Sequence, residues 1–256
     1  MTRARGVEKG RLLSMALVAL ALAGCGGGGA SGAAAAAASR NDSTPSPPGA
    51  DTAASVDRSR TGAADAPATV VVAGTSLTAG LGLDPSRAYP ALLQRKADSA
   101  GYRVRVVNAG LSGETSAGLL RRIDWLLQRE PAAVVVIETG ANDGLRALDP
   151  DSTRANLEAI VEKVRAAQPD ARVLLVQMEA PPNLGADYTS RFRAAYPAVA
   201  RKTGATLVPF LLEGVVGVDS LNQSDRIHPN AAGAERVAAT VWGPLARVLA
   251  DTAGPA

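Results

Sequence analysis

The sequence is poor in several residue types that particular classes of protein need. Of its 256 residues, one is cysteine, one is histidine and 3% are aromatic. A single cysteine excludes a disulfide framework, and so few nitrogen and sulfur ligands argue against a zinc-type metal centre. So few aromatic rings offer little for stacking nucleobases, and glycine-rich fingerprints for dinucleotides or phosphates are missing as well. We therefore expect no metal, no other cofactor and no nucleic-acid partner.

An excess of one charge sign is also missing once the first residues are set aside. The whole chain has a formal net charge of +3, but residues 1–24 contain four basic side chains and one acidic side chain. Basic and acidic residues are equal in number beyond residue 24. Such a balanced chain presents no basic surface for a polyanion, which agrees with the lack of a nucleic-acid partner.

Long apolar runs are lacking too. The run Leu12–Ala23 follows four basic residues and is too short to span a bilayer, a combination typical of a secretory signal. It ends in Leu22-Ala23-Gly24-Cys25, which resembles the bacterial lipobox and implies removal of residues 1–24 and lipidation of Cys25. The alternative is a buried helix with a stray cysteine.

The expected lipid on Cys25 predicts membrane attachment in the bacterial cell envelope, with the protein facing the periplasm or the exterior. Gly26 follows the cysteine, where some Gram-negative lipoproteins carry an aspartate that retains them in the inner membrane. An outer-membrane position is therefore preferred if the source is Gram-negative.

The rest of the chain divides by composition. Residues 25–67 consist mostly of Gly, Ala, Ser, Thr, Asp and Pro, with Val56 as the one large apolar residue, and predict a disordered tether behind the lipidated cysteine. Residues 68–251 have the size and pattern of one domain, and 252–256 are expected to form a disordered tail. Nothing in the sequence indicates an oligomeric state.

Within the expected domain, short runs rich in Val, Leu and Ile alternate with helical patterns. The runs are too continuous for strands with one exposed face, so we expect strands buried on both faces. The predicted strands are Thr69–Ala73, Arg103–Ala109, Ala133–Glu138, Arg172–Met178 and Thr206–Phe210. The predicted helices are Tyr89–Ala100, Ser116–Arg129, Ser152–Gln168, Tyr188–Thr203 and Ala231–Ala250, the last interrupted at Gly243-Pro244.

This alternation predicts an α/β fold: a three-layer α/β/α sandwich with a mainly parallel central sheet of about five strands. Ligands of such folds bind at the carboxyl ends of the strands. The functional residues are therefore expected where strands end.

A serine follows the first predicted strand. In Gly74-Thr75-Ser76-Leu77, the glycine permits a sharp turn that would leave Ser76 at the strand's carboxyl end, where a nucleophile belongs. The alternative is that Ser76 caps the N-terminus of a helix.

The single histidine favours catalysis. His228 lies three residues after Asp225, ahead of the last predicted helix. A neutral imidazole can accept the proton of a serine hydroxyl, and a carboxylate on its other nitrogen fixes the tautomer. The alternative is an exposed loop histidine beside Pro229, with Asn230 capping the last helix.

Four short blocks follow one another in the expected domain, each after a predicted strand or before the last helix. The blocks are Gly74-Thr75-Ser76-Leu77, the segment 108–115, Gly140-Ala141-Asn142-Asp143-Gly144 and Asp225-x-x-His228. They make the chain from about Thr69 to Ala250 similar to the SGNH, or GDSL-like, hydrolase family, and within it to the arylesterase and lysophospholipase/thioesterase branch. The resemblance implies a flavodoxin-like fold, catalytic residues Ser76, Asp225 and His228, and an oxyanion hole of the Ser76 amide, Gly113 and Asn142; Asp143 is left as structural.

One position departs from the family pattern. The family usually has aspartate before the nucleophile, where this chain has Thr75. A hydroxyl replaces one hydrogen bond but not a charge, so we expect Thr75 to lower turnover or shift the pH dependence while the triad stays intact.

The segment 178–188 resembles the substrate-covering loop of the thioesterase/lysophospholipase branch. Its candidate substrate contacts are Pro181, Asn183, Leu184 and Tyr188. An ordinary strand-to-helix connection is the alternative.

The expected function is hydrolysis of carboxylic or thio esters by a serine esterase, an EC 3.1-type enzyme acting on a small-molecule or lipid ester. A carbohydrate O-acetylesterase of the same family and a non-catalytic envelope binding lipoprotein are the alternatives. An α/β-hydrolase is disfavoured, because its Gly-x-Ser-x-Gly elbow would need glycine where this chain has Thr78.

Overall fold

The computed structural model describes residues 66–252. The expected signal peptide (1–24), Cys25 and nearly all of the tether (25–67) lie outside these residues, as do residues 253–256. Those expectations therefore stay predictions. Within residues 66–252, no helix is both long enough and apolar enough to cross a membrane.

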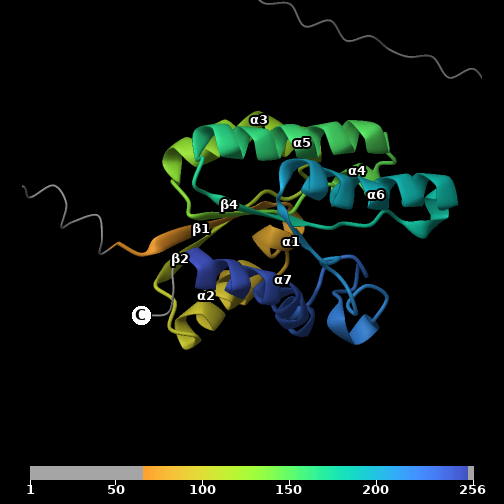
Figure 1. The fold of residues 1–256 in the computed structure, drawn as a ribbon. Helices are drawn as coiled ribbons and strands as arrows, with labels where there is room; N and C mark the ends of the chain where they lie inside the picture. Colours follow the sequence, from red (N-terminus) through yellow and green to blue (C-terminus); the bar gives the residue numbers. More distant parts are fainter. Residues whose placement is uncertain (1–65, 253–256) are drawn as a thin grey trace, which may run out of the picture. The chain divides into compact units, whose positions relative to one another are not determined.

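Five parallel strands form one sheet in the order β2-β1-β3-β4-β5, which confirms the predicted α/β architecture (Figure 1). The central strands are runs of valine and other β-branched or leucine residues, which suit a surface covered on both faces. The strands are β1 (Ala68–Gly74), β2 (Val104–Gly110), β3 (Val134–Ile137), β4 (Arg172–Val176) and β5 (Thr206–Val208).

Strand β2 is not buried on both faces, and that expectation was wrong for it. Arg105 is exposed, and Val106 and Val107 are only half-buried. The cause is position: β2 pairs only with β1 and forms an edge of the sheet. Arg105 bonds to Glu130 across this edge, and an exposed charge there discourages pairing with another chain.

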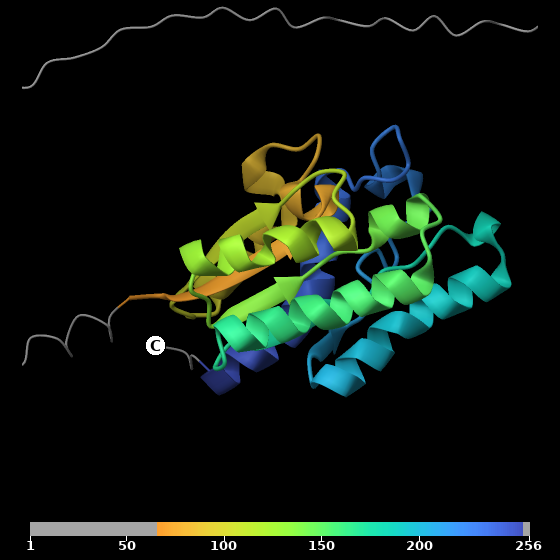
Figure 2. The ribbon, with the colours of Figure 1, turned by 90° about the horizontal axis from the view of Figure 1, so that it is seen from above.

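Helices cover both faces of the sheet, as Figures 1 and 2 show. Helices α3, α5 and α6 pack side by side on one face, and α2 and α7 pack together on the other. The long helices are α2 (Tyr89–Ser99), α3 (Ser116–Arg129), α5 (Pro150–Ala167), α6 (Ala186–Thr203) and α7 (Ala231–Thr252). The short ones are α1 (Ser76–Ala79), α4 (Ala141–Leu145), η1 (Pro85–Arg87), η2 (Pro182–Leu184) and η3 (Asp219–Leu221).

Helix α7 runs without a break through Gly243-Pro244, so the predicted interruption was wrong. Gly243 has no side chain to clash with the proline ring, and Pro244 is buried in the core face of the helix. Burial of the ring offsets the backbone hydrogen bond that a proline cannot make.

The carboxyl ends of the strands place the candidate residues together. Ser76 follows β1, Gly113 follows β2 and Asn142 follows β3, and these three strands are neighbours in the sheet. The connection between β5 and α7 carries Asp225 and His228. The topology thus builds one site at one edge of the sheet.

Candidate active site

The turn after β1 presents Ser76. Thr75, not Ser76, is the cap of α1: its hydroxyl accepts the amide of Leu77 at 3.4 Å. This excludes the reading of Ser76 as a helix cap and leaves its hydroxyl free for other contacts. Gly74 is required by space, since a Cβ there would lie 2.0 Å from the Thr78 hydroxyl.

Asp225, His228 and Ser76 form a continuous chain of hydrogen bonds. The Nδ1 of His228 lies 2.6 Å from Asp225 Oδ2, and its Nε2 lies 2.8 Å from Ser76 Oγ. The His228 side chain is 17% exposed and that of Asp225 is 45% exposed. The structure therefore brings together the three residues that the sequence singled out, although 152 positions separate serine and histidine.

The charge of Asp225 decides which way the protons point. Hydrogen bonds from the His228 amide, the His228 ring and the Ile227 amide lower the pKa of Asp225 from 3.8 to about 2. An ionised carboxylate can only accept, so Nδ1 carries the hydrogen and Nε2 has its lone pair toward Ser76. In this arrangement the serine hydroxyl donates to Nε2, as transfer of its proton requires.

A compact loop holds the histidine. The Asp225 Oδ1 accepts hydrogen bonds from the amides of Ile227 and His228. Arg226, which follows Asp225, has a φ of 59°, which is unusual for a residue with a side chain. Asn230 caps α7 by accepting the amides of Ala232 and Gly233, which was part of the alternative interpretation of this loop and is compatible with catalysis.

Gln223 connects the histidine loop to the serine turn, and sequence reasoning missed it. Its Nε2 donates to the carbonyl of Leu81 at 2.7 Å and to that of Pro229 at 3.0 Å. No sequence pattern pointed to Gln223, since nothing in the sequence distinguishes it from other loop residues. The contact is visible only when the two loops are placed side by side.

Of the candidate oxyanion donors, one forms a hydrogen bond within the described part of the chain and two backbone amides do not. Asn142 lies in α4 rather than in the Asn-Asp-Gly turn that was its alternative, and its Nδ2 donates one hydrogen to the carbonyl of Glu114 at 2.9 Å. Within residues 66–252, the amides of Ser76 and Gly113 donate to no protein acceptor. The carbonyl of Gly113 accepts from Arg146 at 2.9 Å, which holds this peptide in place.

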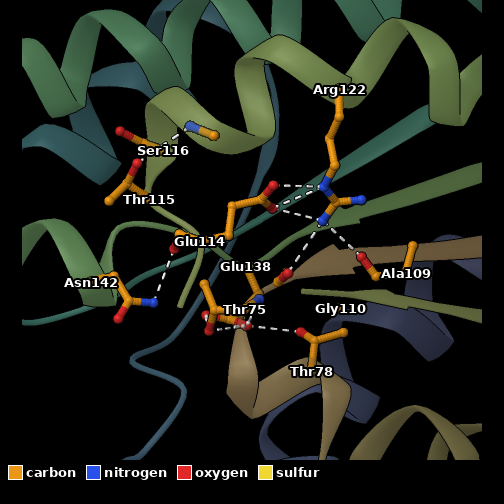
Figure 3. A network of polar contacts seen from close by, with 12 residues as sticks. Thr75, Thr78, Ala109, Gly110, Glu114, Thr115, Ser116, Arg122, Glu138 and Asn142 are labelled. Carbon is orange, nitrogen blue, oxygen red and sulfur yellow. Dashed lines mark hydrogen bonds and ion pairs between the residues drawn. The ribbon is translucent and has the colours of Figure 1, made fainter. Parts of the chain in front are cut away.

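Arg122 is a second residue that sequence reasoning missed. From α3 it forms a bidentate ion pair with Glu114, and its Nη2 also donates to the carbonyls of Ala109 and Gly74 (Figure 3). It thereby joins the ends of β1 and β2 to the loop that carries Gly113. Asp143 is buried and accepts from the amide and hydroxyl of Ser116, in agreement with a structural role.

The four substrate-loop candidates lie in or next to η2 and in the first turn of α6: Pro181 precedes η2, Asn183 and Leu184 belong to it, and Tyr188 belongs to α6. The hydroxyl of Tyr188 donates to the carbonyl of Leu148 at 2.5 Å and its ring stacks on Phe192. None of Pro181, Asn183, Leu184 and Tyr188 lines the small cavity next to Ser76 and His228. That cavity is lined mainly by apolar groups, among them Leu81, Leu83, Ala234 and Val237.

Comparison with known proteins gives consistent matches. The family model described as "GDSL-like Lipase/Acylhydrolase family" matches residues 72–236. The chain is 46% identical to the esterase TesA of Pseudomonas aeruginosa over 181 residues, 71% of this chain and 89% of that protein. It is 40% identical to "Thioesterase 1/protease 1/lysophospholipase L1" of Escherichia coli K12 over 171 residues, 67% and 78% of the two chains. A crystal structure of TesA superposes with a TM-score of 0.68 at 46% identity, covering 71% of this chain and 99% of that one.

Proposed function

This chain belongs to the GDSL-like lipase/acylhydrolase family and is an ester-hydrolysing enzyme, and from that premise we propose that it is a serine esterase with Ser76 as nucleophile, His228 as general base and Asp225 as orienting carboxylate. The observation that carries the proposal is the chain of hydrogen bonds from Asp225 through His228 to Ser76.

The first half of the reaction forms an acyl-enzyme. Nε2 of His228 takes the Ser76 proton as Oγ attacks the carbonyl carbon of the ester, and Asp225 stabilises the imidazolium that results. The carbonyl oxygen becomes an anion, which the amides of Ser76 and Gly113 and the second Nδ2 hydrogen of Asn142 are proposed to bind. Collapse of the intermediate breaks the ester bond, and His228 returns the proton to the departing alcohol or thiol.

The second half regenerates the serine. Water gives a proton to Nε2 of His228 and attacks the acyl carbon, and the same donors stabilise the second oxyanion. Collapse then releases the carboxylic acid, and Ser76 recovers its proton from the imidazolium.

Apolar groups near the serine favour acyl esters or thioesters as substrates. Leu81 and Leu83 line the cavity next to Ser76, and Ile227, beside His228, is 45% exposed. These side chains suit an acyl or aryl group better than a sugar ring with its many hydroxyls. We therefore propose an arylesterase, lysophospholipase or acyl-thioesterase type of activity.

The test uses protein lacking residues 1–65, a fluorophosphonate probe and short p-nitrophenyl esters. We expect covalent labelling and hydrolysis, both lost in Ser76→Ala and kept in Ser99→Ala, a matched change at an exposed serine of α2. Undiminished hydrolysis in Ser76→Ala contradicts the mechanism. Failure of the unchanged protein to react with either reagent would favour a non-catalytic binding lipoprotein.

A carbohydrate O-acetylesterase is the second candidate, because the proposed triad serves acetyl esters of glycans equally well. A panel of p-nitrophenyl acetate, p-nitrophenyl octanoate, lysophospholipid, acyl-thioester and acetylated xylan separates the two. Faster turnover of the xylan than of the acyl substrates contradicts the acyl-ester assignment.

We also propose that lipidation of Cys25 anchors the enzyme in the cell envelope, on the strength of the lipobox-like Leu22-Ala23-Gly24-Cys25. Cys25→Ala is expected to move the protein from the membrane fraction to the soluble fraction. Unchanged membrane attachment of this variant contradicts the anchor.

A further inference from the structure

A buried carboxylate lies directly behind the serine turn and has no part in the proposed mechanism. Glu138 follows β3, is 0% exposed and is fixed through its backbone amide, which donates to the carbonyl of Ala73 at 2.8 Å. Its side chain points toward the residues around Ser76 (Figure 3).

The carboxylate of Glu138 accepts from both sides of the proposed nucleophile. The Thr75 amide donates to Oε2 at 2.9 Å, and the Thr75 hydroxyl lies 3.1 Å from each oxygen. The Thr78 hydroxyl donates to Oε2 at 2.8 Å and also contacts the Tyr89 hydroxyl. One carboxylate thus accepts hydrogen bonds from Thr75 and Thr78, which lie before and after Ser76 in the turn.

The carboxylate of Glu138 also lies against the backbone at the end of β1. A Cβ on Gly74 would lie 2.6 Å from Glu138 Oε2, so the backbone of the turn is packed against the carboxylate itself. By contrast, the one side-chain hydrogen bond that Ser76 forms with the described part of the chain is to His228. The position of Ser76 therefore depends on its neighbours and on what holds them.

We propose that Glu138 is a positioning residue for Ser76: its ionised carboxylate fixes the Gly74–Thr78 turn, and its protonation loosens that turn and lowers the reactivity of the serine. This inference rests on the proposed function of Ser76. It adds a second ionisation, besides that of His228, to the pH dependence of the enzyme.

The surroundings of Glu138 contain no compensating cation. Within residues 66–252 it forms no ion pair, and the titratable groups whose pKa is raised by burial and also by its charge are Tyr89 of α2 and Tyr196 of α6. Asp143 of α4 also acts on Tyr196. Arg122 of α3 reaches the carbonyl of Gly74 but is paired with Glu114.

Burial without a cation raises the pKa of Glu138 from 4.5 to about 7, although hydrogen bonds from Thr75 and Thr78 oppose the shift. The carboxylate therefore changes its charge within the ordinary working range of pH.

This contact gives a physical reason for threonine, rather than the aspartate usual in the family, at position 75. A hydroxyl donates to the carboxylate of Glu138, whereas an aspartate at that position would bring a second negative charge next to it. The threonine therefore complements the charge of its partner.

The decisive variant is Glu138→Gln, which keeps the shape of the side chain and cannot ionise. We expect kcat for a soluble p-nitrophenyl ester to fall on the order of tenfold above pH 8, with KM nearly unchanged, because a slightly displaced nucleophile reacts more slowly. The rate of fluorophosphonate labelling of Ser76 should fall by a similar factor. Glu158→Gln on α5, far along the chain from the turn, is the matched control and should change neither.

The pH profile separates positioning from a general loss of structure. In the unchanged protein, kcat should fall in acid more steeply than one ionisation allows, since Glu138 and His228 both take up protons. In Glu138→Gln the acid limb should have the slope of one ionisation. An equal plateau kcat and an equal slope in the two proteins overturn the proposal.

A second pair of variants keeps the test decisive if Glu138→Gln does not fold. Thr75→Val removes the hydroxyl that donates to Glu138 at nearly constant volume, and Thr75→Ser keeps it. We expect Thr75→Val to lower the labelling rate and Thr75→Ser to restore it. Equal rates for both variants overturn the proposal, whereas loss of labelling in the unchanged protein overturns the proposed function instead.

Discussion

At the scale of residues, the hydrogen bonds that Asp225 accepts set the direction of the proposed proton transfer. The Oδ1 atom already accepts two backbone amides, so in an Asp225→Asn variant the amide oxygen will occupy that position. The new NH2 group then faces Nδ1 of His228 and stabilises the tautomer with a hydrogen on Nε2, which cannot accept the Ser76 proton.

We therefore expect Asp225→Asn to lower kcat on the order of 10⁴-fold, because the wrong tautomer cannot take the Ser76 proton. The change should be measured with a p-nitrophenyl ester at pH 8, together with a thermal unfolding curve. A kcat within threefold of the unchanged protein, with the fold retained, would show that Asp225 does not orient the histidine.

Asn142 is the one proposed oxyanion donor that is a side chain, so a substitution can remove it. Asn142→Ala removes the proposed oxyanion donor and also the hydrogen bond to the Glu114 carbonyl. We expect kcat to fall by about 10²-fold or more with little change in KM, because the anion exists only in the transition state. A rise in KM at constant kcat would instead assign Asn142 to ground-state binding.

At the scale of elements, Arg122 links α3 to the ends of β1 and β2. Arg122→Lys keeps the charge but loses the planar fork that reaches Glu114 and two carbonyls at once. We expect lower thermal stability and lower kcat, both measurable on one sample. Arg121→Lys, at the exposed neighbouring position, is the control and should leave both unchanged.

Element boundaries also show what sequence reasoning can reach. All five strands and all five long helices were predicted, because continuous valine and leucine runs and helical spacing extend over enough residues to be read. Helices α1 and α4 were not predicted, since four or five residues make little more than one helical turn and cannot show a repeating apolar pattern. The break expected at Pro244 failed because burial of the ring cannot be seen in the sequence.

The same limit applies to the site. Ser76, Asp225 and His228 could be proposed from the sequence, because a serine follows the first strand and a lone histidine beside a carboxylate is conspicuous. Glu138, Gln223 and Arg122 could not be, because each is an ordinary polar residue in the sequence. The threonines that donate to Glu138 lie 60 and 63 positions away, and the partners of Gln223 and Arg122 include residues of other loops and strands. The carboxylate at the end of a fully apolar run was the one available signal.

For the molecule as a whole, Glu138 links folding to pH. Its pKa is raised from 4.5 to about 7 in the folded protein, so the folded state binds more protons than the unfolded state between these values. The stability that this proton contributes is complete below about pH 4.5 and is lost as pH rises through about 7. The expected loss is about 3 kcal/mol at most.

Urea unfolding at pH 5 and pH 8 tests this linkage. The free energy of unfolding of the unchanged protein, relative to that of Glu138→Gln, should be lower at pH 8 than at pH 5, because the variant has no charge to bury. The opposite sign would mean that Glu138 is stabilised as an anion. A variant that is more stable yet less active at pH 8 would be a trade of stability for activity.

The parallel sheet has one more consequence, for handling the enzyme outside the cell. Ser76 follows the carboxyl end of β1, so Ala68, where the strand begins, lies at the opposite end of the strand, roughly 20 Å away. Helix α7 starts near the histidine loop and runs back, and Figures 1 and 2 show it ending at the same end of the sheet as the start of β1. A fusion partner, an affinity tag or a solid support attached at either end of the domain is therefore expected to leave the proposed active site uncovered.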